Sequence, residues 1–478
     1  MRFWTIIALI LVLSALGLTY EIAAGRVLAP YFGTSLLTWT AVIAVVLAGF
    51  SVGSAWGGFI AERERATAAS NVRTALVATA VLMALSPTLL AVIHGSGARG
   101  TGGMLVTVVL TFFPASVAVT LPSPFLAKLA VEARPGREGS SLGIVLSAGS
   151  VGAIFGAILA GFVTLPLIGS TATFAGCGTV ALICLLFIRG SKAGDPPGGI
   201  IAGAVAFIAV TGIWGGSTCM YESGLSCIHV TEERGEVRMY SDRTLQAAEP
   251  LDGNGDLALS YTRWLWARMD ADLGPAPSVL FIGGGGYTLP TKLLQSRPAA
   301  QAVAVEIDPL ITRVVQRNLP NAAAMIERAG YKLTRAGPDV DARLGIVHAD
   351  GRVYLNETDR RFDAAVLDAF SSGSVPAHLV TIETVERLRE ITDGPVYVNL
   401  IDRPDGPLAR GVYAILGATY PFVVVEQGPV GATGRANILL AASHTPLETL
   451  DTGLDGYAPT AISPARAFTD DRGWVGHR

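Results

Sequence analysis

A glycine-rich stretch in the second half of the chain, from Ser278 to Asp308, most constrains what the chain can fold into. It reads SVLFIGGGGYTLP, continues through a helical pattern and ends in QAVAVEIDP. A short apolar strand therefore runs into four glycines and a helix, and a second strand ends on Glu306 about twenty residues later. This order is typical of a nucleoside-binding βαβ unit in a doubly wound sheet.

The glycines and the residues around them are candidate contacts of a nucleoside cofactor. Glycine has no Cβ atom, so the backbone can turn tightly there and approach a ligand closely. Glu306, at the end of the second strand, is placed to accept hydrogen bonds from the ribose hydroxyls. Tyr287 opens the following helix and either closes over the cofactor or simply packs. The remaining candidates are Gly283, Gly284, Gly285 and Ile307.

The pattern after Ser278 alternates strands with helices, which favours one mostly parallel sheet covered on both faces. The expected strands are 278–283, 301–307, 344–348, 362–368, 394–400, 420–427 and 436–442.

Acids follow the third and fourth strands, at the sheet edge where such folds bind ligands. Asp350, with Gly351 after it, is placed to accept an adenine amino group, and Asp368 faces whatever lies over the cofactor. Each acid alone is also explained as a helix N-cap. Three acids at three strand ends favour a binding site. His378 is a second candidate base, although a lone histidine is more often a hydrogen-bonding structural residue.

The first half of the chain is far more apolar than the second. The whole chain is 51% hydrophobic and only 15% charged, and the long apolar runs precede residue 217. Runs of this length predict membrane-spanning helices. Seven spans are expected, at 3–24, 36–60, 73–93, 103–127, 141–165, 171–188 and 199–216. Glycines four residues apart, Gly53 with Gly57 and Gly152 with Gly156, predict close helix packing first and transport features second.

Three charged residues lie near the ends of these spans: Glu21, Arg26 and Lys128. Two interpretations are open, namely interfacial anchoring with a Glu21–Arg26 pair, and the lining of a polar cavity. Lys and Arg residues number nine on the side of the N-terminus and two on the other side. This asymmetry predicts a multi-pass protein of the plasma membrane with a cytoplasmic N-terminus, and seven spans put the C-terminal domain outside. A nucleoside cofactor made in the cytoplasm argues for the opposite side.

Net charge and cysteine content exclude some classes. A formal net charge of −3 gives no reason to expect a nucleic-acid partner. The four cysteines have no metal-ligand spacing, so we expect no metal site. Cys219 and Cys227 fit either a disulfide bond in an oxidising compartment or two buried thiols.

The predicted organisation has four parts. Residues 1–217 form the membrane domain, 218–275 a β-hairpin and helix, 276–445 the nucleoside-cofactor domain and 446–478 a loop-like tail. The hairpin follows from alternating apolar residues around Glu-Arg-Gly-Glu.

These motifs, taken together, resemble the spermidine synthase family of aminopropyltransferases, and the whole chain resembles its membrane-fused branch. The matching pieces are YSDRTLQ, Tyr261, IGGGGYTLP, VEIDP, HADGRVYL, VLDAFSSGSVPAHLVT, FTDD and the N-terminal YEIAAGRVLAPYFG. The resemblance implies a Rossmann-like, methyltransferase-type fold behind a β-hairpin domain, with decarboxylated S-adenosylmethionine as the cofactor. It also implies that Gln246, Glu306 and Asp350 hold that cofactor, that Asp368 deprotonates an attacking amine and that Tyr261 belongs to the catalytic group.

Three departures from the family pattern make the substrate less certain than the fold. Gly286, Ser371 and Arg263 stand where the family has acids that suit a cationic diamine. Ordinary S-adenosylmethionine and methyl transfer to a polar or membrane-associated acceptor are therefore an alternative to aminopropyl transfer to an amine. A transporter with a nucleoside- or polyamine-sensing domain is a third hypothesis. The expected partners are a small-molecule amine or polar acceptor, the lipid bilayer and a second copy of the chain in a homodimer.

Overall fold

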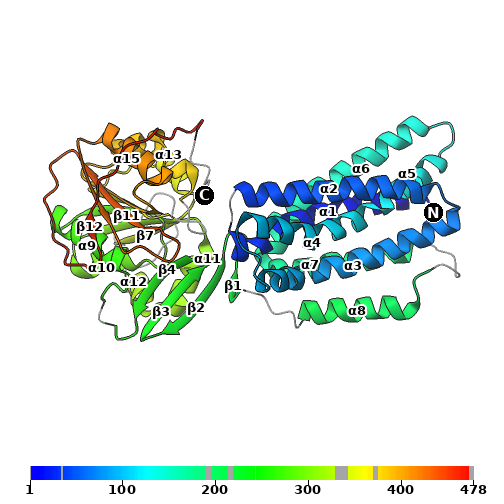
Figure 1. The fold of residues 1–478 in the computed structure, drawn as a ribbon, viewed down its shortest axis with the longest axis horizontal. Helices are drawn as coiled ribbons and strands as arrows, with labels where there is room; N and C mark the ends of the chain where they lie inside the picture. The colour runs from blue at the N-terminus through cyan, green and yellow to red at the C-terminus, as the bar shows by residue number, and fades with distance from the viewer. Residues whose placement is uncertain are drawn as a thin grey trace. The chain divides into compact units, whose positions relative to one another are not determined.

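The protein forms two compact units, Met1–Cys227 and Ile228–Arg478, in a computed structural model (Figure 1). The structure describes residues 2–33, 36–188, 195–213, 219–242, 244–253, 255–328, 343–369 and 375–472.

The first unit is almost entirely helical. Five of its described helical stretches are long and apolar enough to cross a membrane: Phe3–Phe32, Leu36–Ala61, Arg65–Gly95, Gly100–Glu132 and Glu138–Phe187. Its elements are α1 (Phe3–Phe32), α2 (Leu36–Ala61), α3 (Arg65–Gly95), α4 (Gly100–Thr120), α5 (Pro122–Glu132), α6 (Glu138–Ile158), the π-helical η1 (Leu159–Thr164), α7 (Leu165–Cys184), the 3-10 helix η2 (Leu185–Phe187), α8 (Gly198–Ile213) and the short strand β1 (Tyr221–Glu222).

The fifth and sixth predicted spans lie within one 50-residue helical stretch, Glu138–Phe187. That stretch is two helices joined at a break at Gly169, whose φ of 77° is outside the helical region, and the break falls between the two predicted spans. The described part of the seventh predicted span is the 16-residue helix α8, and residues 214–216 of that span lie outside the described residues.

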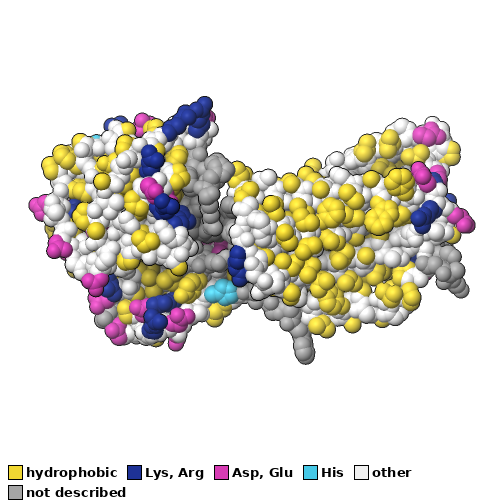
Figure 2. All heavy atoms as spheres, in the orientation of Figure 1, with side chains coloured by type: hydrophobic (Ala, Val, Ile, Leu, Met, Phe, Trp, Pro, Cys, Tyr) yellow, Lys and Arg dark blue, Asp and Glu magenta, His cyan; other side chains and the backbone are white. Residues whose placement is uncertain are grey.

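Small residues set the packing of these helices, as the glycine spacing predicts. A Cβ atom added at Gly152 would lie 2.2 Å from the carbonyl oxygen of Leu11, and one at Gly156 would lie 2.1 Å from that of Ala15. Helices α1 and α6 therefore meet through their backbones. Apolar side chains cover the outer face of the helical unit in Figure 2, while charged side chains gather at the end that carries the N-terminus.

The second unit begins with an antiparallel meander of β2 (Cys227–Glu233), β3 (Glu236–Ser241) and β4 (Thr244–Pro250). Arg234 and Gly235 both have positive φ, as a two-residue hairpin turn of type I′ requires. The first two strands confirm the predicted hairpin. The third strand, which carries Gln246, was not predicted. Helix α9 (Ser260–Asp272) follows the meander.

The central sheet has the order β12-β10-β11-β9-β8-β5-β6-β7. Strand β5 pairs in parallel with β6 and β8, β6 with β7, and β8 with β9, whereas β11 is antiparallel to both neighbours. The predicted, mostly parallel α/β sheet is confirmed. Its strands are β5 (Ser278–Ile282), β6 (Gln301–Glu306), β7 (Leu344–His348), β8 (Ala364–Leu367), β9 (Val396–Asp402), β10 (Phe422–Gln427), β11 (Ala436–Ser443) and β12 (Ala458–Pro459).

The strand order places a topological switch point between β5 and β8. The chain runs from β5 to β6 and β7 on one side, and then returns to β8 and β9 on the other. Ligands of open α/β sheets bind at the carboxyl ends of the strands next to such a point. The connecting helices are α10 (Thr288–Ser296), α11 (Pro309–Asn318), α12 (Pro320–Arg328), α13 (Gly351–Glu357), η3 (Ala377–Leu379), α14 (Ile382–Ile391) and α15 (Pro407–Thr419).

The C-terminal segment is mostly irregular, as predicted, but it is packed onto the sheet domain. Strand β12 pairs with β10. Further along, Asp470 accepts a hydrogen bond from Thr381 at 2.8 Å and pairs with Arg352 at 3.0 Å. These contacts hold the segment around Asp470 against α13 and α14.

Candidate active site

Gly283 and Asp368 lie side by side at the switch point. The amide of Gly283 donates to the carbonyl oxygen of Val305, and the amide of Asp368 donates to that of Ile282, both at 2.9 Å. A Cβ atom at Gly283 would lie 2.4 Å from the carbonyl oxygen of Asp368, and its φ is 100°. Only glycine fits such a crowded position with positive φ, which explains the first glycine of the loop.

Asp368 is held between a helix and a neighbouring strand. The hydroxyl group of Tyr261 on α9 donates to its Oδ2 at 3.2 Å, and Nδ2 of Asn399 on β9 donates to its Oδ1 at 2.9 Å. Burial raises the pKa of the Asp368 carboxyl group to about 6, although both hydrogen bonds act in the opposite direction. Burial also raises the pKa of Tyr261 well above its usual value, so this tyrosine is a neutral donor.

Asn399 is a residue of this site that the sequence analysis missed. It lies in the apolar run VYVNLID, where a single amide in a buried strand is the signal that could have revealed it. Its own Oδ1 accepts a hydrogen bond from Nδ2 of Asn437 at 2.9 Å. The pair fixes which end of the Asn399 amide faces Asp368.

Glu306 lies beneath the glycine loop. Its Oε2 accepts hydrogen bonds from the amides of Gly284 at 3.1 Å and Gly285 at 3.2 Å, and its Oε1 accepts one from the amide of Asp308 at 2.9 Å. Burial raises the pKa of Glu306 to about 7, despite these three donors. An ionised carboxylate has about four acceptor positions, so about one is left for a ligand. The predicted contact with ribose hydroxyls stays a prediction.

Two features next to the glycine loop bear on ligand binding, namely an exposed apolar side chain and a close approach of the β4 backbone. Ile307, directly after Glu306, exposes 51% of its surface at the carboxyl edge of the sheet. Gly285 has a φ of 48°, and a Cβ atom there would lie 3.7 Å from the carbonyl oxygen of Gln246 on β4. The backbone of β4 therefore packs against the glycine loop. Cofactor binding by the Gln246 side chain stays a prediction.

Tyr287 packs beneath the loop in this structure. Its side chain is fully buried, and its hydroxyl group forms a 2.6 Å hydrogen bond with Thr312. Its ring would lie 2.9 Å from a Cβ atom at Gly284. The structure therefore supports the packing interpretation of Tyr287 over the interpretation that it closes over a cofactor.

Asp350 caps a helix and also contacts His378. Its Oδ1 accepts from the amides of Arg352 and Val353 at 2.8 and 3.2 Å, so the helix-cap interpretation is correct. Its Oδ2 lies 2.9 Å from Nε2 of His378. Gly351 is required there, because a Cβ atom would lie 2.6 Å from Ile282. The histidine that was a candidate base thus orients Asp350 instead of contacting Asp368 in the described structure.

The residues that depart from the family pattern have structural explanations in two cases. A Cβ atom at Gly286 would lie 2.2 Å from the Cβ of Ala247, so this position points into the packing against β4. Nε of Arg263 donates to the carbonyl oxygen of Leu257 at 2.5 Å. Ser371 lies outside the described residues.

These features define a Rossmann-like α/β domain with a nucleoside-type glycine loop and a partly buried strand-end acid, joined in sequence to an apolar helical unit. No family model matches the chain. Polyamine aminopropyltransferase 1 of Streptomyces coelicolor is 25% identical over 431 residues, which cover 83% of this chain and 75% of that protein. The polyamine aminopropyltransferases of Vibrio vulnificus (25% identical) and Saccharolobus solfataricus (30% identical) match 34% and 24% of this chain, and 48% and 36% of their own lengths.

Among solved structures, a probable spermidine synthase from Corynebacterium glutamicum aligns at 19% identity and a TM-score of 0.43, over 52% of this chain and 95% of that chain. Spermidine synthase from Thermotoga maritima aligns at 19% identity and a TM-score of 0.36, over 48% and 73% of the two chains. The sequence relatives confirm the predicted resemblance to the spermidine synthase family and support an aminopropyltransferase-like enzyme. Membership in a membrane-fused branch stays a prediction.

Proposed function

We propose that this chain is a membrane-embedded transferase that moves an aminopropyl or related group from a sulfonium nucleoside to an amine. The observation that carries the proposal is the partly buried carboxylate of Asp368 at the switch point, held by Tyr261 and Asn399. The polyamine aminopropyltransferases to which the chain is similar support the reaction class. The five long apolar helices of the first unit support attachment to the bilayer.

The residues at the sheet edge suit a nucleoside of the S-adenosylmethionine type, either decarboxylated or ordinary. Glu306 and Asp350 each accept three hydrogen bonds or close polar contacts already, which leaves each carboxylate about one further acceptor position. Ile307, directly after Glu306, offers an exposed apolar surface at this edge. A nucleoside of this type supplies an electrophilic carbon next to a positively charged sulfur, and the sulfur leaves as a neutral thioether.

Asp368 acts as the base in this proposal. An amine attacks carbon only through a free lone pair, so a proton must leave its nitrogen, and the carboxylate can accept that proton. The hydrogen bonds from Tyr261 and Asn399 occupy one position on each carboxylate oxygen and fix the direction of the others. A pKa of about 6 keeps Asp368 mostly ionised at neutral pH and nearer to the operating pH than an ordinary aspartate.

Methyl transfer is the second candidate function, and Arg263 is the observation that favours it. The family acid that suits a cationic substrate is absent at this position, and the arginine adds a positive charge near Tyr261 in the sequence. Losing one charge-assisted hydrogen bond costs about 1.5–3 kcal/mol. A cationic diamine is therefore a weaker substrate choice than in the family.

One experiment separates the two reactions. The purified full-length protein is incubated with decarboxylated or ordinary S-adenosylmethionine and a panel of amines, and the nucleoside product is identified by mass spectrometry. Methylthioadenosine shows aminopropyl transfer, whereas S-adenosylhomocysteine shows methyl transfer. The Asp368→Asn variant is the negative control. No product and no calorimetric binding of either nucleoside would refute both enzyme proposals and leave a sensing or transport role.

A further inference from the structure

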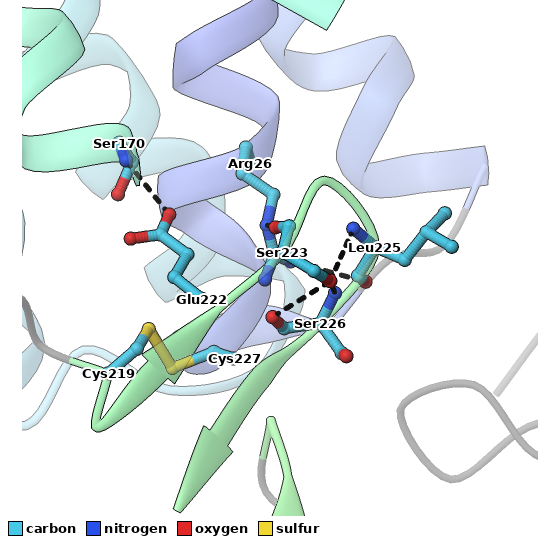
Figure 3. The surroundings of a disulfide bond; sticks show 8 residues. All are labelled: Arg26, Ser170, Cys219, Glu222, Ser223, Leu225, Ser226 and Cys227. Carbon is cyan, nitrogen blue, oxygen red and sulfur yellow. Dashed lines mark hydrogen bonds between the residues drawn. A yellow bond between two sulfur atoms is a disulfide. The ribbon is translucent and has the colours of Figure 1, made fainter. Parts of the chain in front are cut away.

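A disulfide bond closes a short loop at the end of the helical unit (Figure 3). Cys219 and Cys227, eight positions apart, are joined through their sulfur atoms. Inside the loop, Oγ of Ser223 accepts hydrogen bonds from the amides of Leu225 and Ser226 at 3.0 and 2.9 Å. Residues 219–227, called the disulfide loop below, therefore form a compact, internally bonded segment.

The disulfide loop is fastened to two helices of its own unit. Nε of Arg26 on α1 donates to the carbonyl oxygen of Ser223 at 3.1 Å, and its Nη1 lies 3.4 Å from that of Leu225. The carboxylate of Glu222 accepts a 2.9 Å hydrogen bond from the amide of Ser170. Both contacts are visible in Figure 3.

The contact with Ser170 lies where α7 is broken. Gly169 has a φ of 77°, and a Cβ atom there would lie 2.7 Å from Oε2 of Glu222. The helix resumes at Ser170, whose amide donates to Glu222, and a carboxylate is favourable at such an N-terminus. The disulfide loop thus marks the end of the helical unit at which α1 finishes and α7 resumes.

Other contacts mark the opposite end. Nζ of Lys128 donates to the carbonyl oxygen of Ala61 at 2.7 Å, where α2 finishes. Arg73 donates to the carbonyl oxygens of Leu185 and Ile188 at 2.8 and 2.6 Å, and pairs with Asp195 at 3.3 Å.

Helix α8 connects these two ends. Asp195 precedes α8 and is bound to Arg73 at one end, while the disulfide loop follows α8 and is bound to Arg26 and Ser170 at the other. The 16 residues of α8 rise by about 24 Å. The chain therefore changes ends between residues 195 and 219.

Charge identifies which end faces the cytoplasm. Among the described residues of the helical unit, seven Lys and Arg residues lie on the side of the N-terminus, with Lys128 and Arg73 among them, and two, Arg26 and Arg99, lie on the other side. Positively charged residues concentrate on the cytoplasmic side of membrane proteins. Charged side chains also gather at the N-terminal end in Figure 2.

We infer that the disulfide loop lies on the non-cytoplasmic face of the membrane and is closed there by oxidation, and that the domain beginning at Ile228 therefore works outside the cytoplasm. The inference rests on the contacts of the helical unit and not on the proposed reaction. Closure joins the thiolates of Cys219 and Cys227 and removes two electrons. A protein or small-molecule disulfide of the oxidising compartment accepts these electrons and is released as two thiols.

Cysteine labelling of the full-length chain in spheroplasts tests the inference. Replacing the two buried thiols, Cys177→Ala and Cys184→Ala, leaves only the pair in question. A membrane-impermeant maleimide polymer should add nothing before reduction. After a membrane-impermeant reductant it should shift the protein by two polymer masses in intact spheroplasts. In the Cys219→Ser variant the remaining Cys227 is buried in the folded chain, so this variant should shift by one polymer mass without reductant once the protein is denatured.

Three results would overturn the inference. Labelling that needs opened cells but no reductant would place two free thiols in the cytoplasm, and labelling of intact spheroplasts without reductant would show that no disulfide forms. If the pair reacts only after denaturation and reduction, a protease-sensitive epitope after Arg478 decides the side. Cleavage in intact spheroplasts supports the non-cytoplasmic location, and protection overturns it. If the Ala variants fail to fold, the unsubstituted chain replaces them. Its two buried thiols, Cys177 and Cys184, then add two further polymer masses after denaturation.

Discussion

Tyr261 and Asp368 come from segments more than a hundred residues apart, and the tyrosine hydroxyl donates to the Asp368 carboxylate at 3.2 Å. Helix α9 thereby contributes to a site otherwise built from strand ends. The hydrogen bond stabilises the ionised carboxylate, while burial destabilises it, and burial has the larger effect on the Asp368 pKa. Burial and the hydrogen bonds from Asn399 and Tyr261 together set the pH range in which Asp368 can act as a base.

Asp368→Asn should reduce turnover by about 100- to 10,000-fold, the usual range for loss of a positioned base. The asparagine keeps the size of the side chain but cannot accept the proton. Formation of the nucleoside product by the purified full-length protein measures the effect. Asp359→Asn is the matched control, because Asp359 is exposed and lies away from the strand ends. Unchanged turnover in Asp368→Asn would remove Asp368 from the mechanism.

The rate should depend on pH through Asp368. The ionised form of Asp368 is required for catalysis. Protonation of Asp368 should therefore lower kcat/KM about tenfold for each pH unit below about pH 6. Tyr261→Phe removes a donor to the carboxylate, which raises the pKa and should move this break to higher pH. Tyr420→Phe is the control, since the buried Tyr420 hydroxyl has no hydrogen-bond partner in the described structure. A lower rate with an unmoved break would limit Tyr261 to a structural role.

Much of the sheet domain was predictable from local sequence pattern. Apolar runs ending in glycine or an acid located β5 to β8 within a few residues, and the positions of Gly283 and Asp368 followed from the rule that ligand sites lie at strand carboxyl ends. The glycine pairs of the helical unit likewise predicted its close contacts, because a missing side chain has a direct steric consequence.

What the sequence could not predict depends on which strands become neighbours. Asn399 reaches Asp368 only because β9 lies beside β8 in the sheet. Asp350 and His378 meet because η3 returns over the start of α13, and Gly286 is crowded because β4, itself not predicted, packs against the loop. Tertiary neighbours of this kind leave no periodic signal along the chain.

Burial of Glu306 should make the stability of the protein depend on pH. Its folded pKa of about 7 lies above the ordinary value of 4.5, so the folded state binds the proton more tightly than the unfolded state. The stabilisation is fully present below pH 4.5 and is lost as the pH rises through 7. With about 1.4 kcal/mol per pKa unit, the upper limit is about 3.5 kcal/mol.

Melting of the detergent-solubilised protein at pH 5 and pH 7.5 checks this expectation. The wild type should lose stability relative to Glu306→Gln between the two values, because glutamine does not ionise. Glu357→Gln, at an exposed position, should show no such difference. A wild-type advantage that grows with pH would mean that the three backbone donors, and not burial, dominate at Glu306.

Gly286 should tolerate no side chain, although its backbone has an ordinary φ. An added Cβ atom would lie 2.2 Å from the Cβ of Ala247, and overpacking of this kind costs about 1–3 kcal/mol. Gly286→Ala should therefore lower the melting temperature, while Gly274→Ala, whose Cβ would meet nothing within 4 Å, should not. Combining Gly286→Ala with Ala247→Gly should recover most of the loss, because the second change removes the atom that clashes. If the double variant is no more stable than Gly286→Ala alone, the crowding is not the reason for the glycine. If it recovers, an aspartate at position 286 would point at β4, and restoring the family acid would require the meander to move before any cationic substrate could benefit.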